Sequence, residues 1–509
     1  MFYKALDLKQ KKKWFFKYAE GYREHKQYDR AEMMYKNILR LYNHDKQGGL
    51  DYVHMELDDL ANYPKAEQIV RREVLDYHVN DKDALLLLGD IYLEWGTEED
   101  PSKFSDAFEQ YSILCQLYGA TNDYLARLMR YHVRTDSLKD VLADKEMFYP
   151  NENSLVAEDW TEMSGYLMDK LYGELSPQEE YLREKIEDVH SMLVRAVKKD
   201  PVNPISRYNI SRYYIESGDH LRAIEGLKKT IELFELSRHM KKRDVYKQLN
   251  TYRLLGEQYI YSRDYILAQE TLVDGISLFE KKKVENALES DRNVGVMYAD
   301  MADIDYFISG DLENAERNYI NSINNKNDNP SVRYRVGYIQ YGNKDYDTAF
   351  KNFIIASQDK DSDNNLMLAL GNTLALRDDN YASSGYYERL LDSLNLEIGK
   401  KDVLFPQVKE EDTALVEAFM KASNNLGVTE FRLARQTGNS SMNGESIYHF
   451  QNSLRAWDAL TRNQETMVRL GGTNLAEQNI KYVTSPITSY EPAIYTNIPR
   501  ILENEKALE

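Results

Sequence analysis

The stretch Gly218–Glu235, GDHLRAIEGLKKTIELFE, decides how this chain folds. It opens with a Gly-Asp pair, which is typical of turns, and continues with apolar residues three or four positions apart. This spacing places a set of residues on one helix face: Ala223, Leu227, Thr230, Ile231 and Phe234. The first residue of that face, Ala223, is small, and similar phrases recur along the chain.

The recurring phrases share a constant internal spacing. In each, a small residue or its equivalent precedes an alanine by 12 positions: Ala19 and Ala31, Ser211 and Ala223, Gly256 and Ala268, Asp303 and Ala315, Gly337 and Ala349. The offset predicts two antiparallel helices joined by a short turn. The small residue of the first helix then faces the alanine of the second where the axes cross closest. An aspartate in the turn is able to cap the second helix.

These phrases resemble the tetratricopeptide repeat (TPR), whose unit is about 34 residues long. The step from Ala315 to Ala349 is 34 residues, whereas the steps between the middle alanines, Ala223, Ala268 and Ala315, are longer. The resemblance covers roughly residues 14–460. It implies an all-α fold, a TPR-like right-handed superhelix (α-solenoid) of antiparallel helix pairs, in which each repeat buries its apolar face against a neighbour.

The strength of the pattern divides the chain into segments. We predict N-terminal TPR-like repeats over 1–119, degenerate helical repeats over 120–203, a regular array over 204–398, a C-terminal TPR-like repeat with a long loop over 399–462, and an extended tail or cap over 463–509. In the degenerate part, Gln178–Lys198 is predicted to be a second helix of a pair. Three prolines, Pro486, Pro492 and Pro499, indicate an extended tail.

The composition argues against several classes of function. The formal net charge of -19 repels phosphate backbones and anionic membranes, so we expect no nucleic-acid partner. No apolar run is long enough for a membrane span, so no direct membrane insertion is expected. A single cysteine, Cys115, excludes an intrachain disulfide.

No motif for chemistry stands out. The nine histidines lack the spacing of a helical zinc protease, and the chain has no glycine-rich phosphate loop and no nucleophile elbow. We therefore expect no enzyme activity, no metal site and no cofactor.

Tyrosine is unusually frequent, with 40 residues against 15 phenylalanines. Many tyrosines fall at positions between the helices of a pair: Tyr22, Tyr35, Tyr92, Tyr214, Tyr259, Tyr306 and Tyr319. There a long ring spans the gap between helices and its hydroxyl reaches a polar edge.

The resemblance also implies a partner-binding surface. In TPR proteins the inner surface is lined by first-helix residues one and four places after the small residue and three places before it. The matching residues here are Tyr208, Arg212, Ile215, Arg253, Glu257, Ile260, Asp300, Ile304, Phe307, Tyr334, Tyr338 and Tyr341. Aromatic and arginine side chains are typical of protein-binding hot spots. The alternative is that neighbouring helices or the chain's own tail cover these residues.

The leading hypothesis is a non-catalytic scaffold that binds other proteins through the concave groove or the repeat surface. The block NNLGVTEFRLARQTG (424–438) and the Tyr/Pro-rich tail are similar to spirochaetal repeat proteins that build the collar of the periplasmic flagellar motor. That likeness implies self-assembly into a larger complex and a periplasmic location; otherwise the cytoplasm is expected. The alternatives are a regulatory peptide sensor and an accessory region of an enzyme whose catalytic domain lies elsewhere.

Overall fold

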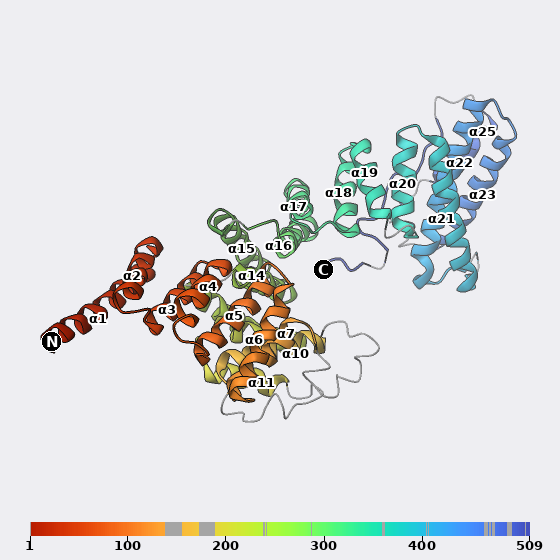
Figure 1. Cartoon of the computed structure of the whole chain (residues 1–509). Helices are drawn as coiled ribbons and strands as arrows, with labels where there is room; N and C mark the ends of the chain where they lie inside the picture. The colour runs from red at the N-terminus through yellow and green to blue at the C-terminus, as the bar shows by residue number, and fades with distance from the viewer. Residues whose placement is uncertain are drawn as a thin grey trace. The chain divides into compact units, whose positions relative to one another are not determined.

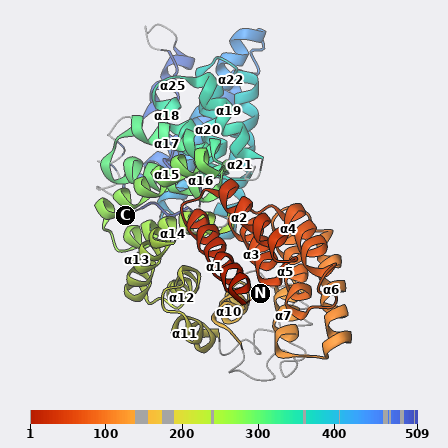
Figure 2. The same ribbon diagram turned by 60° about the vertical axis from the view of Figure 1, so that its left-hand side comes forward.

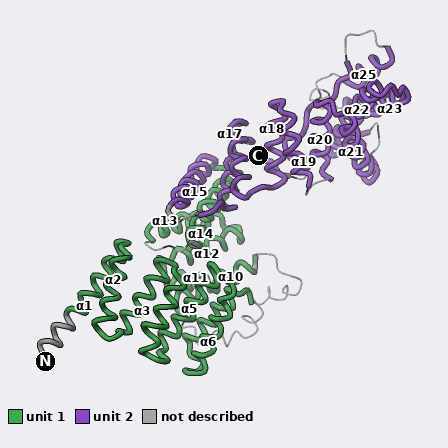
Figure 3. Tube along the Cα trace, turned by 45° about the horizontal axis from the view of Figure 1, so that its top comes forward, with its two compact units in different colours: residues 1–264 green, residues 265–509 purple. Residues whose placement is uncertain are grey.

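The computed structural model describes residues 2–137, 155–172, 189–237, 240, 242–286, 288–358, 362–403, 405, 407–462, 467, 470, 474–485, 491–503 and 505–508. Within these ranges the regular secondary structure is helical, and no strand is assigned. The chain separates into two compact units, residues 1–264 and 265–509 (Figure 3). This boundary falls inside the stretch 204–398 that the sequence pattern groups as one array.

Unit 1 is a series of helices (Figures 1 and 2). Its described elements are α1 (Phe2–Glu24), α2 (Tyr28–Leu41), α3 (Lys46–His54), η1 (Met55–Asp59), α4 (Tyr63–Ile69), η2 (Val70–Leu75), α5 (Lys82–Glu98), α6 (Lys103–Tyr118), α7 (Asn122–Arg134), α10 (Ala157–Tyr172), α11 (Val189–Lys199), α12 (Pro204–Glu216), α13 (His220–Leu236) and α14 (Lys242–Tyr261). Short turns join consecutive helices such as α5 and α6, or α12 and α13, which pack as pairs. Of the helix predicted over Gln178–Lys198, residues 178–188 lie outside the described ranges and the remainder falls in α11.

Unit 2 continues the same architecture. Its described elements are α15 (Tyr265–Asn286), α16 (Arg292–Asp303), η4 (Ile304–Ser309), α17 (Leu312–Asn324), α18 (Pro330–Gly342), α19 (Tyr346–Ser357), α20 (Asn364–Leu376), α21 (Asn380–Lys400), η5 (Glu410–Asp412), α22 (Thr413–Thr437), α23 (Met442–Leu460) and α25 (Leu475–Thr484). The pairs are α16 with α17, α18 with α19, α20 with α21, and α22 with α23. Each unit is therefore an all-α, TPR-like stack of helix hairpins.

The turn aspartates cap the second helices, as the sequence predicts. The side chains of Asp219, Asp311, Asp345 and Asp379 each accept a hydrogen bond from the backbone N–H three residues on. Each cap satisfies one of the backbone donors that a helix N-terminus leaves free. The sequence thus sets where the second helix of each hairpin begins.

The predicted register of small residues is present, with one refinement. Ala223, Ala315 and Ala349 are fully buried. In the pair α20–α21, Ser383 takes the alanine position, and its hydroxyl donates to the carbonyl of Gly371 at 2.9 Å. The two backbones therefore meet where the 12-residue offset places them.

The refinement concerns what fills the space that the glycine leaves. A Cβ added at Gly371 would lie 2.6 Å from Cε1 of Tyr387, and one at Gly337 would lie 2.7 Å from Cε1 of Phe353. These rings come from the second helix, one turn after the alanine position. Glycine is therefore required because an aromatic ring packs flat against the backbone of the first helix.

The interhelix tyrosines are mostly buried, and their hydroxyls have specific partners. Tyr306 and Tyr319 have no exposed surface, and Tyr92 is 3% exposed. The Tyr319 hydroxyl donates to Asp303 Oδ1 at 2.5 Å. Asp303, which replaces the small residue of this repeat, thus satisfies a buried phenol. Tyr22 and Tyr214 are only half-buried.

The C-terminal segment combines a helix and an extended strap. The tail predicted over 463–509 is not extended throughout, because Leu475–Thr484 form α25. After it, residues 491–499 have no regular secondary structure and run back past α22, α20 and α18 toward α16 (Figure 1). This segment defines the site described next.

Candidate functional site

The first helices of the repeats in unit 2 carry the predicted inner-wall positions, and the C-terminal tail lies on them. We define the tail as the described residues of 491–508 and the groove as the described surface of η4, α18, α20, α22 and α25 that contacts it. Hydrogen bonds join the tail to the groove from Ala493 to Glu505. Those from η4, α18 and α20 connect residues that are 123–194 positions apart in the chain. The groove of unit 2 is therefore occupied by the chain itself.

Asparagine side chains hold the first part of the tail by its backbone. Asn425 Nδ2 donates to Tyr495 O at 2.9 Å, and its Oδ1 accepts from Tyr495 N at 2.7 Å. Asn372 Nδ2 donates to the same carbonyl at 3.0 Å. The amide of Asn425 thus replaces the backbone pairing that a neighbouring strand supplies in a sheet.

A second asparagine pair repeats the arrangement two residues earlier. Asn479 Nδ2 donates to Ala493 O at 3.0 Å, and its Oδ1 accepts from Ala493 N at 3.1 Å. Asn424 Nδ2 donates to the same carbonyl at 3.1 Å. Both asparagines are fully buried. Because alternate backbone groups are bound, the tail must be extended here.

Tyrosine hydroxyls hold the next part. The hydroxyls of Tyr341, Tyr334 and Tyr306 donate to the carbonyls of Thr496, Pro499 and Arg500 at 2.7, 2.8 and 2.9 Å. Burial raises the pKa of Tyr334 well above its usual range, so its hydroxyl stays protonated and donating. These hydrogen bonds are also made to the backbone of the tail and not to its side chains.

Three aliphatic side chains anchor the tail at four-residue intervals. Ile494, Ile498 and Leu502 are 7%, 9% and 1% exposed. Ile498 and Leu502 join the apolar core around α20 and α22, and Ile494 joins the cluster that includes Val428 and Ala476. Their burial supplies the apolar part of the binding energy.

Charged groups fix the C-terminal end of the tail. Glu503 accepts from the backbone N–H of Asn364 at 3.2 Å and from its side-chain Nδ2 at 3.1 Å. Glu505 accepts from Ser331 and from Arg335 Nη2, the latter at 3.4 Å. Arg335 also pairs with Asp303 at 2.6 Å, which orients its guanidinium toward the tail.

The remaining predicted positions of unit 2 lie around these contacts. Phe307 packs beneath the Arg500 guanidinium, whose carbon is 5.7 Å from the ring centroid. The Tyr338 ring meets Tyr306 edge-on at 5.9 Å. Ile304 is buried in the helix pair, and Asp300 is half-buried. The tail hydrogen-bonds directly to two of the predicted residues, Tyr334 and Tyr341.

Two of the six predicted positions of unit 1 line a different, charged surface. Tyr208 and Arg212 belong to the lining of a cavity of 830 Å³, together with Arg134, Glu162 and Lys247. The Arg212 guanidinium pairs with Asp169 at 2.6 Å. Desolvation lowers the pKa of Lys247. Of the other predicted positions, Arg253 pairs with Glu257, and Ile215 and Ile260 are half-buried.

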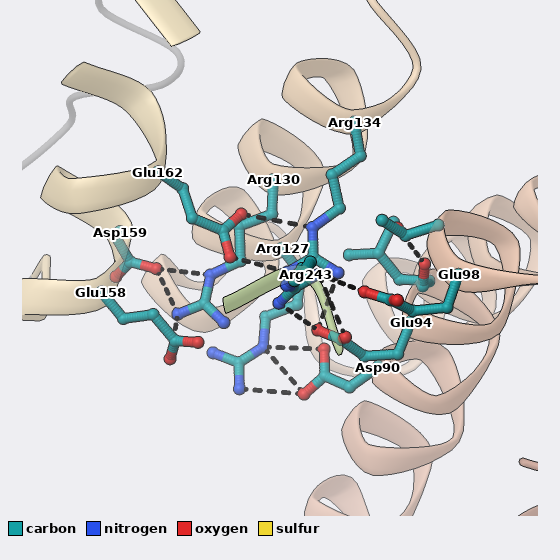
Figure 4. A network of polar contacts seen from close by, with 12 residues as sticks. Asp90, Glu94, Glu98, Arg127, Arg130, Arg134, Glu158, Asp159, Glu162 and Arg243 are labelled. Atoms are coloured by element: carbon teal, nitrogen blue, oxygen red, sulfur yellow. Dashed lines mark hydrogen bonds and ion pairs between the residues drawn. The ribbon is translucent and has the colours of Figure 1, made fainter. Parts of the chain in front are cut away.

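A ladder of ion pairs crosses the first helices of unit 1 next to this cavity (Figure 4). Acidic residues of α5 and α10 face three arginines of α7, and the members are Asp90, Glu94, Glu98, Arg127, Arg130, Arg134, Glu158, Asp159, Glu162 and Arg243. Arg134 lies at its centre, 2.7 Å from Glu94 and 2.6 Å from Glu162. Arg243 on α14 reaches Glu94 on α5 at 3.3 Å, so unit 1 curls back on itself.

The sequence analysis missed the asparagines that hold the tail. Their positions follow the register that it used: Asn372 lies one place after Gly371, and Asn424 lies three places before Gly427. Applying the register to the weaker C-terminal repeats would have found both. Asn425 lies outside the register, and Asn479 lies on α25, beyond the recognised repeats.

Neither a metal site nor a membrane-spanning helix is found in the part of the chain that the structure describes. No three His, Cys, Asp or Glu side chains converge there in a way that could hold a metal ion. Among the described helices, none is both long enough and apolar enough to cross a bilayer.

Comparisons with known proteins concern the fold. No protein-family model matches the chain, and no curated protein matches its sequence. Solved structures of similar helical-repeat chains include apo RapI, with 12% identity, a TM-score of 0.43 and coverage of 75% of this chain and 99% of that one. The C-terminal part of a TPR repeat-containing protein from Cytophaga hutchinsonii has 12% identity, a TM-score of 0.37 and coverage of 59% and 99%. Yeast Tom70 has 15% identity, a TM-score of 0.32 and coverage of 96% and 99%.

Proposed function

We propose that this chain is a non-catalytic scaffold that binds other proteins, and that the groove of unit 2 takes an extended segment of a partner. The observation that carries the proposal is the bound tail. Its backbone from Ala493 to Ile501 is held by side-chain amides and hydroxyls of the groove. Contacts to the main chain give affinity for any extended segment, while side-chain pockets select among segments.

The groove positions that hold the side chains of the tail indicate which partner segment would fit. Buried positions for Ile494, Ile498 and Leu502 require aliphatic side chains four residues apart. Arg335 and Ser331 require an acidic or polar group near the C-terminal end. A partner with this pattern displaces the tail by making the same contacts. A protein partner also suits the net charge of -19, which disfavours nucleic acid.

The predicted inner wall of unit 1 enters the proposal as a second contact surface. Tyr208 and Arg212 line the cavity there, and their neighbours carry both signs of charge. Such a surface suits a partner that presents both acidic and basic side chains. Complementary charges of this kind give specificity more than affinity.

The test compares three full-length proteins in pull-downs from native cells. Wild type has its groove occupied, the variant Ile498→Glu/Leu502→Glu releases the tail, and a third protein adds Asn372→Ala and Asn425→Ala to the released variant. The proposal predicts that tail release increases recovery of one partner set at least several-fold and that the asparagine changes abolish the increase. Equal recovery by all three proteins, each folded by circular dichroism, contradicts it.

The same groove supports the alternative of a regulatory peptide sensor. A sensor takes a short free peptide, whereas a scaffold takes a segment of a folded partner. The species recovered with the tail-released variant distinguishes the two functions. An accessory role beside a catalytic domain predicts recovery of an enzyme.

A finer proposal is a ring-forming component of the periplasmic flagellar motor collar. It rests on the resemblance of residues 424–438 and on the tail. In this chain Asn424 and Asn425, the first residues of that block, bind the tail. A ring requires self-association, so light scattering at micromolar concentration tests it: an oligomer of defined mass supports the collar role, and a monomer contradicts it.

A further inference from the structure

An acidic cavity lies between α21, α22 and α23. Its volume is 630 Å³, and its described lining includes four acidic residues: Glu388, Asp392, Glu430 and Glu445. No lysine or arginine is part of that lining. No residue of the tail lines it either, so the cavity is separate from the groove.

The floor of the cavity holds a buried carboxylate with unused bonding capacity. Glu430 is 7% exposed, and among the described residues nothing hydrogen-bonds to its Oε2. Its Oε1 lies 3.4 Å from His449 Nε2. Ser423, which is 1% exposed, also has no described partner for its hydroxyl. Buried polar atoms are normally satisfied, so this pair indicates that the floor receives a ligand that donates hydrogen bonds.

The charges around the floor determine whether that ligand is a cation or an anion. Glu388 and Asp392 on α21 and Glu445 on α23 are exposed at the rim. Burial lowers the pKa of His449, so this histidine is neutral at pH 7 and adds no positive charge to the cavity. The three rim carboxylates, with no lysine or arginine among the described lining residues, attract a cation.

The side chains of the cavity walls indicate which kind of cation fits. Leu391 and Leu426 are buried apolar residues, and the rings of Phe419 and Tyr448 also line the space. Apolar walls suit an alkyl chain, and aromatic rings attract a cationic head group. A bare metal ion does not fit, because no described set of three carboxylate or histidine groups converges on one point.

We propose that this cavity binds an organic cation, an alkyl chain that ends in an ammonium or guanidinium group, with the head group on Glu430 and Ser423. A lysine or arginine side chain of a partner protein and a free polyamine share this chemistry. The cation satisfies Oε2 of Glu430 and the hydroxyl of Ser423, and its stem packs between Leu391 and Leu426. The site gives the protein a further binding surface, distinct from the groove of unit 2 and from the inner wall of unit 1.

Isothermal titration of the full-length protein tests the site with two cationic probes. Agmatine represents a free polyamine, and the blocked tripeptide acetyl-Gly-Arg-Gly-amide represents a partner side chain. The neutral control is acetyl-Gly-Gln-Gly-amide. Binding of at least one cation, and at least tenfold weaker binding of the control, is expected. The cation that binds identifies the source. No binding by either cation, or equal binding of the neutral peptide, overturns the proposal.

Two variants locate the binding. Glu430→Gln should weaken binding of the cation at least tenfold. The control Asp458→Asn changes an exposed residue of α23 outside the lining and should leave the affinity unchanged. Equal affinity in wild type and Glu430→Gln contradicts the assignment.

The release of the Glu430 proton on cation binding provides a second readout, one that a purely structural role of this residue would not produce. Burial, followed by the charges of Glu445 and Glu388, raises the pKa of Glu430 to about 8, and a bound cation lowers it again. Binding at pH 7 should therefore release protons in wild type but not in Glu430→Gln.

Discussion

The side-chain amide of Asn425 binds both backbone groups of Tyr495: Nδ2 donates to the carbonyl at 2.9 Å, and Oδ1 accepts from the N–H at 2.7 Å. The two residues are 70 positions apart in the chain. This contact joins α22 to the C-terminal tail without using the side chain of Tyr495. It shows how a helical repeat can bind the main chain of an extended segment.

Removing this amide should free the tail locally. Asn425→Ala loses two hydrogen bonds to Tyr495, each worth about 0.5–1.5 kcal/mol. We expect hydrogen exchange at the Tyr495 amide to accelerate by about 10- to 100-fold, since about 1.4 kcal/mol is a factor of ten. Mass spectrometry of the peptide that covers residues 491–503 measures it. The matched control is Asn497→Ala, an exposed tail position that should leave exchange at Tyr495 unchanged.

Overpacking at a helix crossing should destabilise unit 2. In Gly371→Ala the new Cβ would lie 2.6 Å from Cε1 of Tyr387. Because Tyr387 is fully buried and has little room to move, the cost should be about 1–3 kcal/mol. Chemical denaturation measures the free energy of unfolding.

Gly385→Ala on α21 is the control for that change. Its Cβ would meet nothing within 4 Å, so it should stabilise the helix by up to about 1 kcal/mol. If both variants shift stability in the same direction, the register at Gly371 is incorrect.

Breaking the ion ladder of unit 1 should be costly. The Arg134 side chain is 7% exposed and pairs with Glu94 and Glu162. Desolvation opposes its charge, but the two carboxylates outweigh this and raise its pKa above the usual range. Arg134→Met leaves their charges unbalanced, and we expect a loss of about 3–5 kcal/mol.

Thermal denaturation of Arg134→Met and Arg222→Met checks this expectation. Arg222 pairs with Asp219 at 3.4 Å, but its side chain is 66% exposed, so its loss should change stability by less than about 1 kcal/mol. A comparable melting temperature for both variants would show that the ladder adds little to folding.

Stability should fall as the pH rises through the range in which Glu430 titrates. Burial raises the pKa of this carboxyl to about 8 in the folded state, from an ordinary value of 4.5. Between these values the folded state binds more protons than the unfolded state, so the unfolding free energy decreases with pH. The cumulative change from this group is on the order of a few kcal/mol.

Glu430→Gln should remove that slope and make the protein more stable than wild type above pH 8. His449, whose pKa burial lowers, adds an opposite slope at lower pH, so the comparison is made above pH 7, where this histidine is neutral in wild type. Denaturation curves from pH 7 to pH 9 measure the difference. A difference that does not change with pH contradicts the shifted pKa.

Much of the fold could be predicted from local sequence, because the packing of each helix hairpin requires particular residue types at a fixed spacing. Alanine at the crossing point, glycine beneath an aromatic ring and aspartate at the turn each reflect contacts within one repeat. The boundary at residues 264 and 265 left no comparable signal, since the helical pattern continues through it.

The site was harder to predict, because its contacts join residues far apart in the chain. The register named Tyr334 and Tyr341, which do hold the tail, but from sequence the tail could equally have pointed away. Asparagine is also common in loops and helix caps, so Asn425 and Asn479 carry no local sign of a role in binding the backbone. Only the folded arrangement shows that their amides face one segment.

The most direct test of the central claim is the affinity of the groove for a synthetic peptide of residues 491–508. The full-length variant Ile498→Glu/Leu502→Glu, with its own tail released, should bind the labelled peptide in a fluorescence anisotropy titration. Wild type should bind at least tenfold more weakly because its groove is filled, and adding Asn372→Ala and Asn425→Ala to the released variant should abolish binding. Equal affinity in all three folded proteins would contradict the claim that this groove binds an extended chain by its backbone.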